Sequence, residues 1–277
     1  MNYKKILTIQ DISCVGQCSL TVALPILSAC GHETAILPSA VLSTHTGGFK
    51  VFTFRDLTDD IPSIQNHWQK ENIKFDAIYT GYLGSTRQIA MVEDIIKSML
   101  NDEGCSAVDP AMADNGKLYP GFDMDYVAAM RKLCSAADLI LPNITEACFL
   151  TGHEYKAEYD EAYVDQLLSK LADLGAGSIV LTGVSYSPET TGVVLYENGN
   201  KQYYQHDRIS RSYHGTGDIY SSAFVGSWLS GLDKFEAIKL AADYTVQCIK
   251  NTIDDDAHWY GVKFETALPV LINKLVK

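Results

Sequence analysis

Apolar residues recur along the chain in two alternating patterns: short runs rich in β-branched residues, and longer stretches with helical spacing. The first pair is typical, since residues 5–10 predict a strand and residues 16–30 predict a helix that stops at Gly31. The same alternation continues through the first two thirds of the chain. It predicts further strands at 33–42, 75–79, 106–108, 138–141 and 178–183, and further helices at 56–72, 85–100, 125–136 and 160–174.

This alternation predicts an α/β fold with a mostly parallel central sheet covered by helices on both faces. Asn198 and Gly199 lie between apolar runs at 193–196 and 202–206, and this turn signal predicts a small hairpin near 193–206. Two more helices are predicted at 233–251 and 262–276. The chain carries no internal repeat and no linker composition, so we expect residues 1–277 to form one domain.

The stretch from His214 to Asp218 predicts a tight turn that becomes the N-terminus of a buried helix. Unpaired N–H groups at a helix start, approached across glycines without a Cβ, form an anion site suited to a phosphoryl group. Asp218 would repel such a ligand unless it does chemistry, and it is placed to accept the proton of an attacking hydroxyl. The alternative is an ordinary cap or dipole partner in a helical first turn.

Polar residues follow most of the predicted strands at their carboxyl ends, the edge where open α/β sheets bind ligands. A small, polar stretch at 111–119 could be either a flap over this edge or a plain surface loop. The residues at the edge are Asp11, Thr46, Tyr82, Asp109, Asn143, Thr182 and the turn at 214–218.

Carboxylates at this edge suggest a divalent cation. Asn143 and Glu146 are three residues apart at a helix start, and Glu146 could hold a cation directly or through water, joined by Asp109. The alternative for Glu146 is a cap of its own helix. The chain lacks the P-loop pattern and the Gly-x-Gly-x-x-Gly fingerprint, which excludes a P-loop nucleotidase and argues against a Rossmann dehydrogenase.

The formal net charge of −12 argues against nucleic acid or an anionic membrane as the main partner. The seven cysteines are odd in number and form no Cys-x-x-Cys pair, which is typical of a reducing compartment. Cys14 and Cys18 are better explained by packing than by a metal. Asp11 interrupts the first apolar run too early for a signal peptide, and no stretch is long enough to span a membrane, so a cytoplasmic protein is expected.

A set of short motifs in this order resembles the pyridoxal (vitamin B6) kinases of the ribokinase-like superfamily over nearly the whole chain. The motifs are Thr8-Ile9-Gln10, His45-Thr46-Gly47, Thr80-Gly81-Tyr82, Asp109-Pro110, Pro142-Asn143-x-x-Glu146 and Gly215-Thr216-Gly217-Asp218. The resemblance implies a ribokinase-like three-layer α/β/α domain that phosphorylates the 5′-hydroxymethyl group of a B6 vitamer with ATP and Mg²⁺. It also implies a small-molecule substrate, frequently a homodimer, and a monovalent cation as a further candidate cofactor.

The resemblance also implies a role for each site residue. Asp218 is then the base, and Gly215, Thr216 and Gly217 form the anion hole, while Asp109, Asn143 and Glu146 form the metal and phosphate region. His45, Thr46 and Tyr82 line the pyridine pocket, Asp114 and Tyr119 lie on a flap over ATP, and Thr182 lies near the nucleotide.

Asp11 departs from the family, which commonly has Ser at this position. A carboxylate facing substrate would favour pyridoxamine over pyridoxal because the aminomethyl group is cationic. The alternative is that Asp11 caps the following turn through the N–H of Ser13 or Cys14.

Three other functions compete with this interpretation. Hydroxymethylpyrimidine kinases are similar but commonly have Cys where this chain has Asp218. Sugar kinases carry a Gly-Gly-x-x-x-Asn stretch that is missing near residues 31–48. A non-catalytic nucleotide-binding regulator that kept the fold is the third, although Asp218 and Glu146 speak against it.

Overall fold

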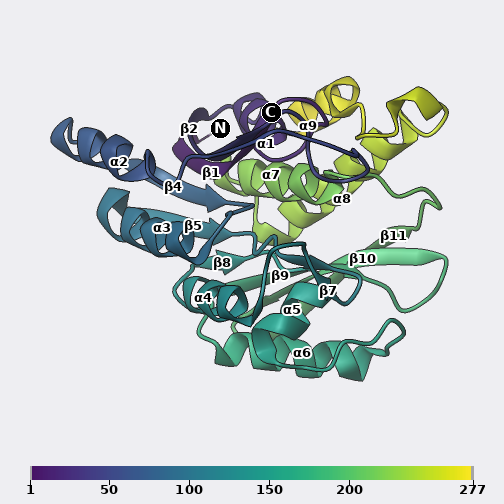
Figure 1. Cartoon of the computed structure of the whole chain (residues 1–277). Helices are drawn as coiled ribbons and strands as arrows, with labels where there is room; N and C mark the ends of the chain where they lie inside the picture. Colours follow the sequence, from purple (N-terminus) through teal and green to yellow (C-terminus); the bar gives the residue numbers. More distant parts are fainter. Residues whose placement is uncertain (1, 276–277) are drawn as a thin grey trace.

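The computed structural model describes residues 2–275 and has three layers, with a twisted sheet between two layers of helices (Figure 1). In this part of the chain the sheet has nine strands in the order β11-β10-β9-β8-β5-β4-β1-β2-β3. The three-layer α/β/α architecture predicted from the sequence is therefore confirmed.

The middle of the sheet is parallel, as the alternation of strands and helices predicted. Its strands are β1 (Lys5–Ser13), β2 (Glu33–Leu42), β4 (Phe75–Thr80), β5 (Leu100–Val108), β8 (Leu139–Ile140) and β9 (Ser178–Val184). Both faces of these strands are covered, which explains why they read as continuous apolar runs. Ile6, Leu7 and Ile9 of β1, for example, are all fully buried.

Antiparallel strands extend both edges of the sheet. The predicted hairpin is present as β10 (Thr190–Glu197) and β11 (Asn200–Asp207), and it pairs with β9. Asn198 and Gly199 have φ of 52° and 77°, as the primed turn requires. The opposite edge is β3 (Phe54–Asp56), which pairs with β2. The prediction missed β3 because its three residues are exposed and carry no apolar pattern.

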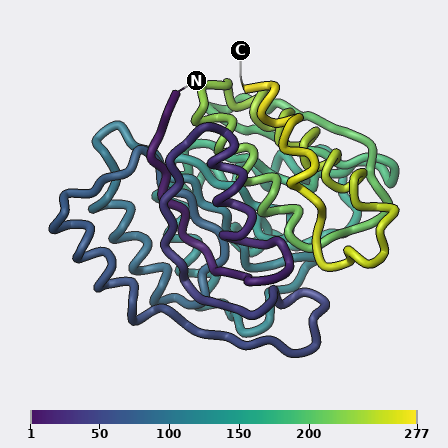
Figure 2. The backbone as a smooth tube through the Cα atoms, turned by 90° about the horizontal axis from the view of Figure 1, so that it is seen from above, coloured from purple at the N-terminus to yellow at the C-terminus, as the bar shows by residue number. Residues whose placement is uncertain are grey.

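Two layers of helices cover the sheet, each over its own buried core. On one face lie α2 (Ile61–Lys70), α3 (Thr86–Met99), α4 (Met124–Ser135), α5 (Ile144–Thr151) and α6 (Glu161–Asp173). On the other lie α1 (Leu20–Ala29), α7 (Thr216–Leu229), α8 (Lys234–Lys250) and α9 (Leu268–Leu275), after short 3₁₀ turns at Asp256–His258 and Phe264–Ala267. Seen from above, the last helices lie beside the N-terminal segment, so the two ends of the described chain are neighbours (Figure 2). None of the described helices is long and apolar enough to cross a membrane.

Helix α7 is buried along nearly its whole length between the sheet, α1 and α8. Gly226 lets α1 approach closely, since a Cβ there would lie 2.6 Å from the Cys30 sulfur. This packing fixes the direction of α7, so that its first turn lies at the carboxyl edge of the parallel strands.

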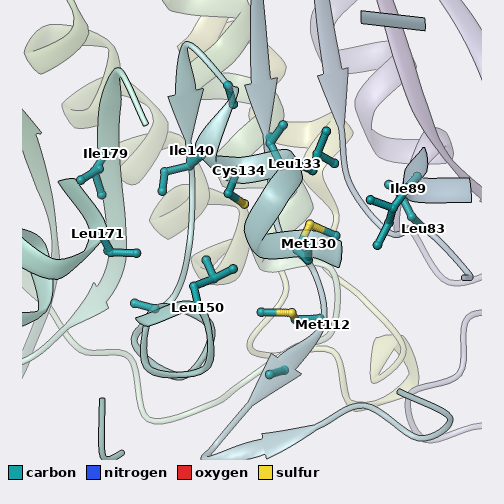
Figure 3. Close-up of a cluster of buried hydrophobic side chains, with 14 of the residues drawn as sticks. Leu83, Ile89, Met112, Met130, Leu133, Cys134, Ile140, Leu150, Leu171 and Ile179 are labelled. Carbon is teal, nitrogen blue, oxygen red and sulfur yellow. The ribbon is translucent and has the colours of Figure 1, made fainter. Parts of the chain in front are cut away.

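The core beneath α2 to α6 anchors the segment 111–119, which the sequence left open between a flap and a plain surface loop. Met112 is fully buried and points among Met130 and Leu150 in the close-up of this cluster (Figure 3). The residues that follow Met112 form a separate two-stranded ribbon, β6 (Ala113–Asp114) and β7 (Lys117–Leu118). The stretch at 111–119 is therefore a hairpin rooted in the core.

Two predicted boundaries shift in a way that affects the site. Strand β1 continues to Ser13, and its pairing with β2 changes register between Gln10 and Ile12, so Asp11 lies at a bulge within the strand and not after its end. Helix α1 begins at Leu20 and not at residue 16, because residues 14–19 form an irregular loop. The apolar spacing did not signal that loop.

Candidate active site

The turn from Gly215 to Asp218 has the conformation that the sequence predicted. Gly215 is the N-cap of α7 with φ of 79°, and a Cβ at this position would lie 2.3 Å from the Gln17 carbonyl oxygen. A Cβ at Gly217 would meet nothing within 4 Å, so the backbone there borders open space. The first N–H groups of α7 therefore border a space that an anion could enter.

Asp218 lies in the first turn of α7, partly buried. Its Oδ2 accepts a hydrogen bond of 3.0 Å from the backbone N–H of Ser19, at the start of α1. Burial raises the pKa of Asp218 to about 6, the Ser19 N–H lowers it, and the charge of Asp11 raises it. A carboxylate with this pKa is mostly ionised at neutral pH and can accept a proton.

Asp109 follows β5 directly and is buried, with 8% of its surface exposed. Its Oδ2 accepts a hydrogen bond of 2.7 Å from the hydroxyl of Ser221, one turn after Asp218 on α7. Burial raises the pKa of Asp109 to about 7, the Ser221 hydroxyl lowers it and Asp218 raises it. Asp109 thus feels the charge of Asp218 at this edge of the sheet.

Glu146 completes a capping box at the start of α5. The Asn143 side chain accepts from the Glu146 N–H at 2.9 Å, and Glu146 Oε2 accepts from the Asn143 N–H at 2.8 Å. Glu146 Oε1 accepts from the Met112 N–H at 3.1 Å. The capping role is therefore present, and Glu146 also ties α5 to the root of the β6–β7 hairpin.

The donor set fits a magnesium ion that is carried in with phosphate. Burial, and after it the charge of Asp109, hold the pKa of Glu146 well above its usual range. Glu146 and Asp109 are therefore two buried carboxylates whose negative charges a cation would stabilise. Among the described residues no group of three or more His, Cys, Asp or Glu side chains could hold a metal alone. Mg²⁺ suits such a place, because it keeps several waters and takes one or two carboxylates together with substrate phosphates.

The β6–β7 hairpin turns at Asn115 and Gly116 and is fastened to α5. The Gly116 N–H donates to the Thr145 hydroxyl at 3.1 Å, and the Asn143 amide donates to the Ala113 carbonyl at 2.9 Å. Asp114 is exposed at the tip. Tyr119 follows the hairpin, and its pKa is raised by burial and by the charges of Glu146 and Asp114.

A cavity of about 740 Å³ opens beside this hairpin. It is bounded by the start of α5, the end of β9 and the segment that leads to β10. Three of the four residues predicted to bind nucleotide line it, namely Asp114, Asn143 and Thr182, whereas Tyr119 does not. Tyr155, Tyr159 and Tyr186 add aromatic surface, and Arg208 adds a cation.

Two of the residues predicted for the acceptor pocket, His45 and Tyr82, lie within electrostatic reach of Asp11. Asp11 is buried, with 4% of the residue exposed, and its Oδ2 accepts from the Ser13 hydroxyl at 2.9 Å. Burial raises the pKa of Asp11, while the Ser19 and Ser13 hydroxyls lower it. The Asp11 charge also lifts the pKa of Tyr82, after burial, so the tyrosine lies within electrostatic reach.

Asp11 does not use the turn N–H that sequence reasoning offered as its alternative partner. The N–H of Cys14 donates to the Leu42 carbonyl at 2.9 Å, which leaves the Ser13 hydroxyl as the local donor to Asp11.

His45 has both ring nitrogens engaged by backbone. Its Nε2 lies 2.6 Å from the Tyr260 carbonyl and its Nδ1 accepts from the Gly47 N–H at 3.0 Å, which fits the neutral Nε2–H tautomer. Burial lowers the His45 pKa, consistent with this neutral form. His45 can therefore act as a wall of the pocket but has no free ring nitrogen for a substrate. Thr46, next to it, is exposed.

Tyr82 ends an aromatic stack that holds its ring in place. Its centroid lies 5.6 Å from that of Phe122, which in turn stacks on Tyr126 at 3.8 Å. The Tyr126 hydroxyl donates to the Leu83 carbonyl at 2.7 Å, so the stack is fixed at its far end.

Sequence reasoning missed several residues that contact the site. Ser221 could have been found, since it lies three residues after Asp218 on one helix face. Ser19 and Arg208 could not, because only tertiary packing brings the first against Asp218 and the second to the cavity.

Comparisons with known proteins identify the family. A protein from Bacteroides thetaiotaomicron, provisionally named a phosphomethylpyrimidine kinase, is 38% identical, with a TM-score of 0.93 and 97% and 93% of the two chains covered. Another crystal form of that protein contains pyridoxal, and it matches with a TM-score of 0.90. Pyridoxal kinase from Lactobacillus plantarum is 32% identical, with a TM-score of 0.90 and 98% and 97% coverage.

A pyridoxal kinase of Granulibacter bethesdensis is 25% identical over 266 residues, with 90% of each chain covered. The model of the phosphomethylpyrimidine kinase family matches residues 28–262, which include Asp218 and every other predicted site residue except Asp11. The chain therefore belongs to the phosphomethylpyrimidine kinase family.

Proposed function

We propose that this protein transfers the γ-phosphoryl group of ATP to the 5′-hydroxymethyl group of a B6 vitamer. The observation that carries the proposal is Asp218, an ionisable carboxylate with a pKa of about 6 at the head of a helix whose N–H groups border open space. The names of the similar proteins support the vitamer, since two of those described are pyridoxal kinases and a third crystallised with pyridoxal.

Each group then has a task. Asp218 takes the proton from the acceptor hydroxyl as its oxygen attacks the γ-phosphorus, and ADP departs with the electrons of the broken P–O bond. The N–H groups at Gly215, Thr216 and Gly217 stabilise the negative charge on the transferred group. The ring of the vitamer would lie between Tyr82 and His45, near Thr46 and Asp11.

The nucleotide would occupy the cavity of about 740 Å³ lined by Asp114, Asn143 and Thr182, with Tyr119 at its border. Asp109 and Glu146 would hold Mg²⁺, through water and the phosphates of ATP, and the ion would neutralise phosphate charge. The negative net charge of the protein makes such a cation useful, because Arg208 is the one cationic residue among the described residues that line the cavity.

Further properties belong to the proposal through the family resemblance. They are a single kinase domain over residues 1–277, a homodimer, a cytoplasmic location and a monovalent cation as a second ion. Gel filtration with light scattering tests the dimer, and activity in potassium compared with sodium buffers tests the monovalent ion.

Phosphorylation of hydroxymethylpyrimidine is the second candidate function, because the matching family model is that of the phosphomethylpyrimidine kinases. Asp218 distinguishes the candidates, since those kinases commonly have Cys at the corresponding position.

One screen tests the proposal. ATP turnover is measured with pyridoxal, pyridoxine, pyridoxamine and hydroxymethylpyrimidine under matched conditions. The proposal expects the highest kcat/KM with one of the three vitamers. A clear preference for hydroxymethylpyrimidine would replace it with the second candidate, and no turnover with any alcohol would indicate a nucleotide-binding regulator.

A further inference from the structure

The loop before α1, residues 14–19, approaches Asp218 in an unusual conformation. Gln17 has φ of 54°, and Ser19 has φ of 55° with ψ of −130°. Residues other than glycine adopt such angles rarely, and only where the surrounding structure holds them. Something outside the loop must therefore hold it.

Ser19 lies between the two carboxylates of the acceptor side. Its backbone N–H donates to Asp218 Oδ2 at 3.0 Å, and its hydroxyl lowers the pKa of Asp11. The residue with this rare backbone conformation is thus the one whose N–H contacts the proposed base.

Gln17 fastens the loop to a segment about 240 residues further along the chain. Its Nε2 donates to both carboxylate oxygens of Glu265, at 2.9 and 3.2 Å. Its Oε1 lies 3.0 Å from Nε2 of His258. Its backbone carbonyl packs against Gly215 of the catalytic turn. Gln17 thus contacts the C-terminal segment with its side chain and the catalytic turn with its backbone.

We propose that Gln17 is a positioning residue for the general base: held by His258 and Glu265, it keeps the 14–19 loop in the conformation that presents the Ser19 N–H to Asp218. The inference rests on the proposed role of Asp218 as base. The segment 258–265 lies about 40 residues after the catalytic turn at 215–218 in the sequence. The inference gives this segment an effect on phosphoryl transfer.

Losing this donor has a defined consequence. The Ser19 N–H orients the Asp218 carboxylate and stabilises its ionised form, so without it the carboxylate rotates more freely and holds its proton to a higher pH. The titratable groups that act on Asp218 or feel its charge come from every element around it, namely Asp11, Cys18, Tyr79, Asp109 and Tyr119. All of these groups are neutral or negatively charged, so none of them can stabilise the ionised Asp218 in place of the Ser19 N–H.

The experiment compares four variants in steady-state assays with ATP and the preferred alcohol from pH 5 to 9. Gln17→Ala and Glu265→Ala remove the hydrogen bonds between Gln17 and Glu265, whereas Glu265→Gln keeps an acceptor for the Gln17 amide. Gln247→Ala is the control, since it removes a side chain on the surface of α8 that donates to Asn251. We expect Gln17→Ala and Glu265→Ala to lower kcat by roughly tenfold, with the KM for ATP within about twofold of the parent.

The acid limb of kcat/KM should also move to higher pH in these two variants, since the base must be ionised to act. Glu265→Gln should recover most of the loss and Gln247→Ala should match the parent. Thermal melting checks that each variant is folded, and if Gln17→Ala does not fold, the Glu265→Ala and Glu265→Gln pair decides.

If Gln17→Ala and Glu265→Ala are folded and have the same kcat and the same acid limb of kcat/KM as the parent, Gln17 is not a positioning residue. Asp218→Asn, assayed in parallel, separates this failure from that of the proposed function. If Asp218→Asn is active, Asp218 is not the base and the proposed function fails as well. If Asp218→Asn is inactive while Gln17→Ala has the kcat of the parent, only the positioning role of Gln17 is refuted.

Discussion

The two halves of the site are built in opposite ways. On the acceptor side, strained backbone at residues 14–19, the bulge at Asp11 and the turn at 215–218 contact one another through Ser19, Asp218 and Gln17. On the nucleotide side, a hairpin and loops surround an open cavity of about 740 Å³. The reacting groups must be held within a fraction of an ångström, whereas a long triphosphate gains affinity from many weaker contacts.

The comparison predicts that substitutions on the acceptor side change kcat or the choice of alcohol, and that those on the nucleotide side change the KM for ATP or the need for metal.

The largest effect is expected from Asp218→Asn. The variant should keep the fold and ATP binding but lose about 10²–10⁴-fold in kcat, because general-base catalysis contributes about that much. Calorimetry with ATP and a turnover assay measure the two properties separately. Turnover within a small factor of the parent would show that Asp218 is not the base.

Asp11→Ser tests whether the buried carboxylate selects the alcohol. A charge-assisted hydrogen bond is worth about 1.5–3 kcal/mol, so the parent should favour pyridoxamine over pyridoxal by roughly tenfold to a hundredfold in kcat/KM, and Asp11→Ser should narrow that ratio. Both ratios come from one set of steady-state assays. An unchanged ratio would limit Asp11 to its bond with the Ser13 hydroxyl.

Glu146→Gln tests the nucleotide side. It keeps an acceptor for the backbone but removes a charge from the proposed metal region, so the Mg²⁺ concentration for half-maximal activity should rise about tenfold, with vitamer binding little changed. Asp160→Ala is the matched control, since Asp160 caps α6 through the Tyr163 N–H at 2.9 Å outside the cavity lined by Asp114. Equal Mg²⁺ dependence in parent and Glu146→Gln would leave Glu146 as a cap alone.

Arg208→Ala should raise the KM for ATP by about threefold to fivefold and leave the KM for the alcohol unchanged, because a single exposed cation interacts weakly with phosphate in water. Arg87→Ala, which removes an exposed arginine paired with Asp59, serves as control. A change in alcohol KM would mean that the two halves are less separate than the structure indicates.

The smallest effect is on stability. Folding raises the pKa of Asp218 from 3.8 to about 6, so the folded protein is more stable when this carboxyl is protonated. This contribution to the free energy of unfolding is fully present below pH 3.8 and is lost as the pH rises through 6. Asp218→Asn should therefore melt a few degrees above the parent at pH 7.5, with a smaller gap at pH 4.5. Scanning calorimetry at both values measures it, and a gap that widens at low pH would contradict the burial argument.

The sequence alone determined the architecture, because apolar periodicity and turn chemistry are local properties. The strand at 33–42 matches β2 at both ends, and the turn at Asn198-Gly199 formed the hairpin it predicts. The glycine turn before Asp218 was equally readable, since a helix start with glycines has a local signature. The sequence also placed Asn143 and Thr182 at one edge, and they line one cavity together with Asp114, which the family resemblance had assigned to a flap over ATP.

Tertiary structure alone decided how these groups are held. The bulge at Asp11 depends on how β1 pairs with β2, and the loop that contains Ser19 is joined to the C-terminal segment by the contacts of Gln17 with His258 and Glu265. These contacts join residues up to 248 positions apart, and no local pattern encodes them because each partner looks like an ordinary polar surface residue in sequence. The pKa values of the carboxylates follow from the same packing, since burial and neighbouring charge exist only after the chain has folded.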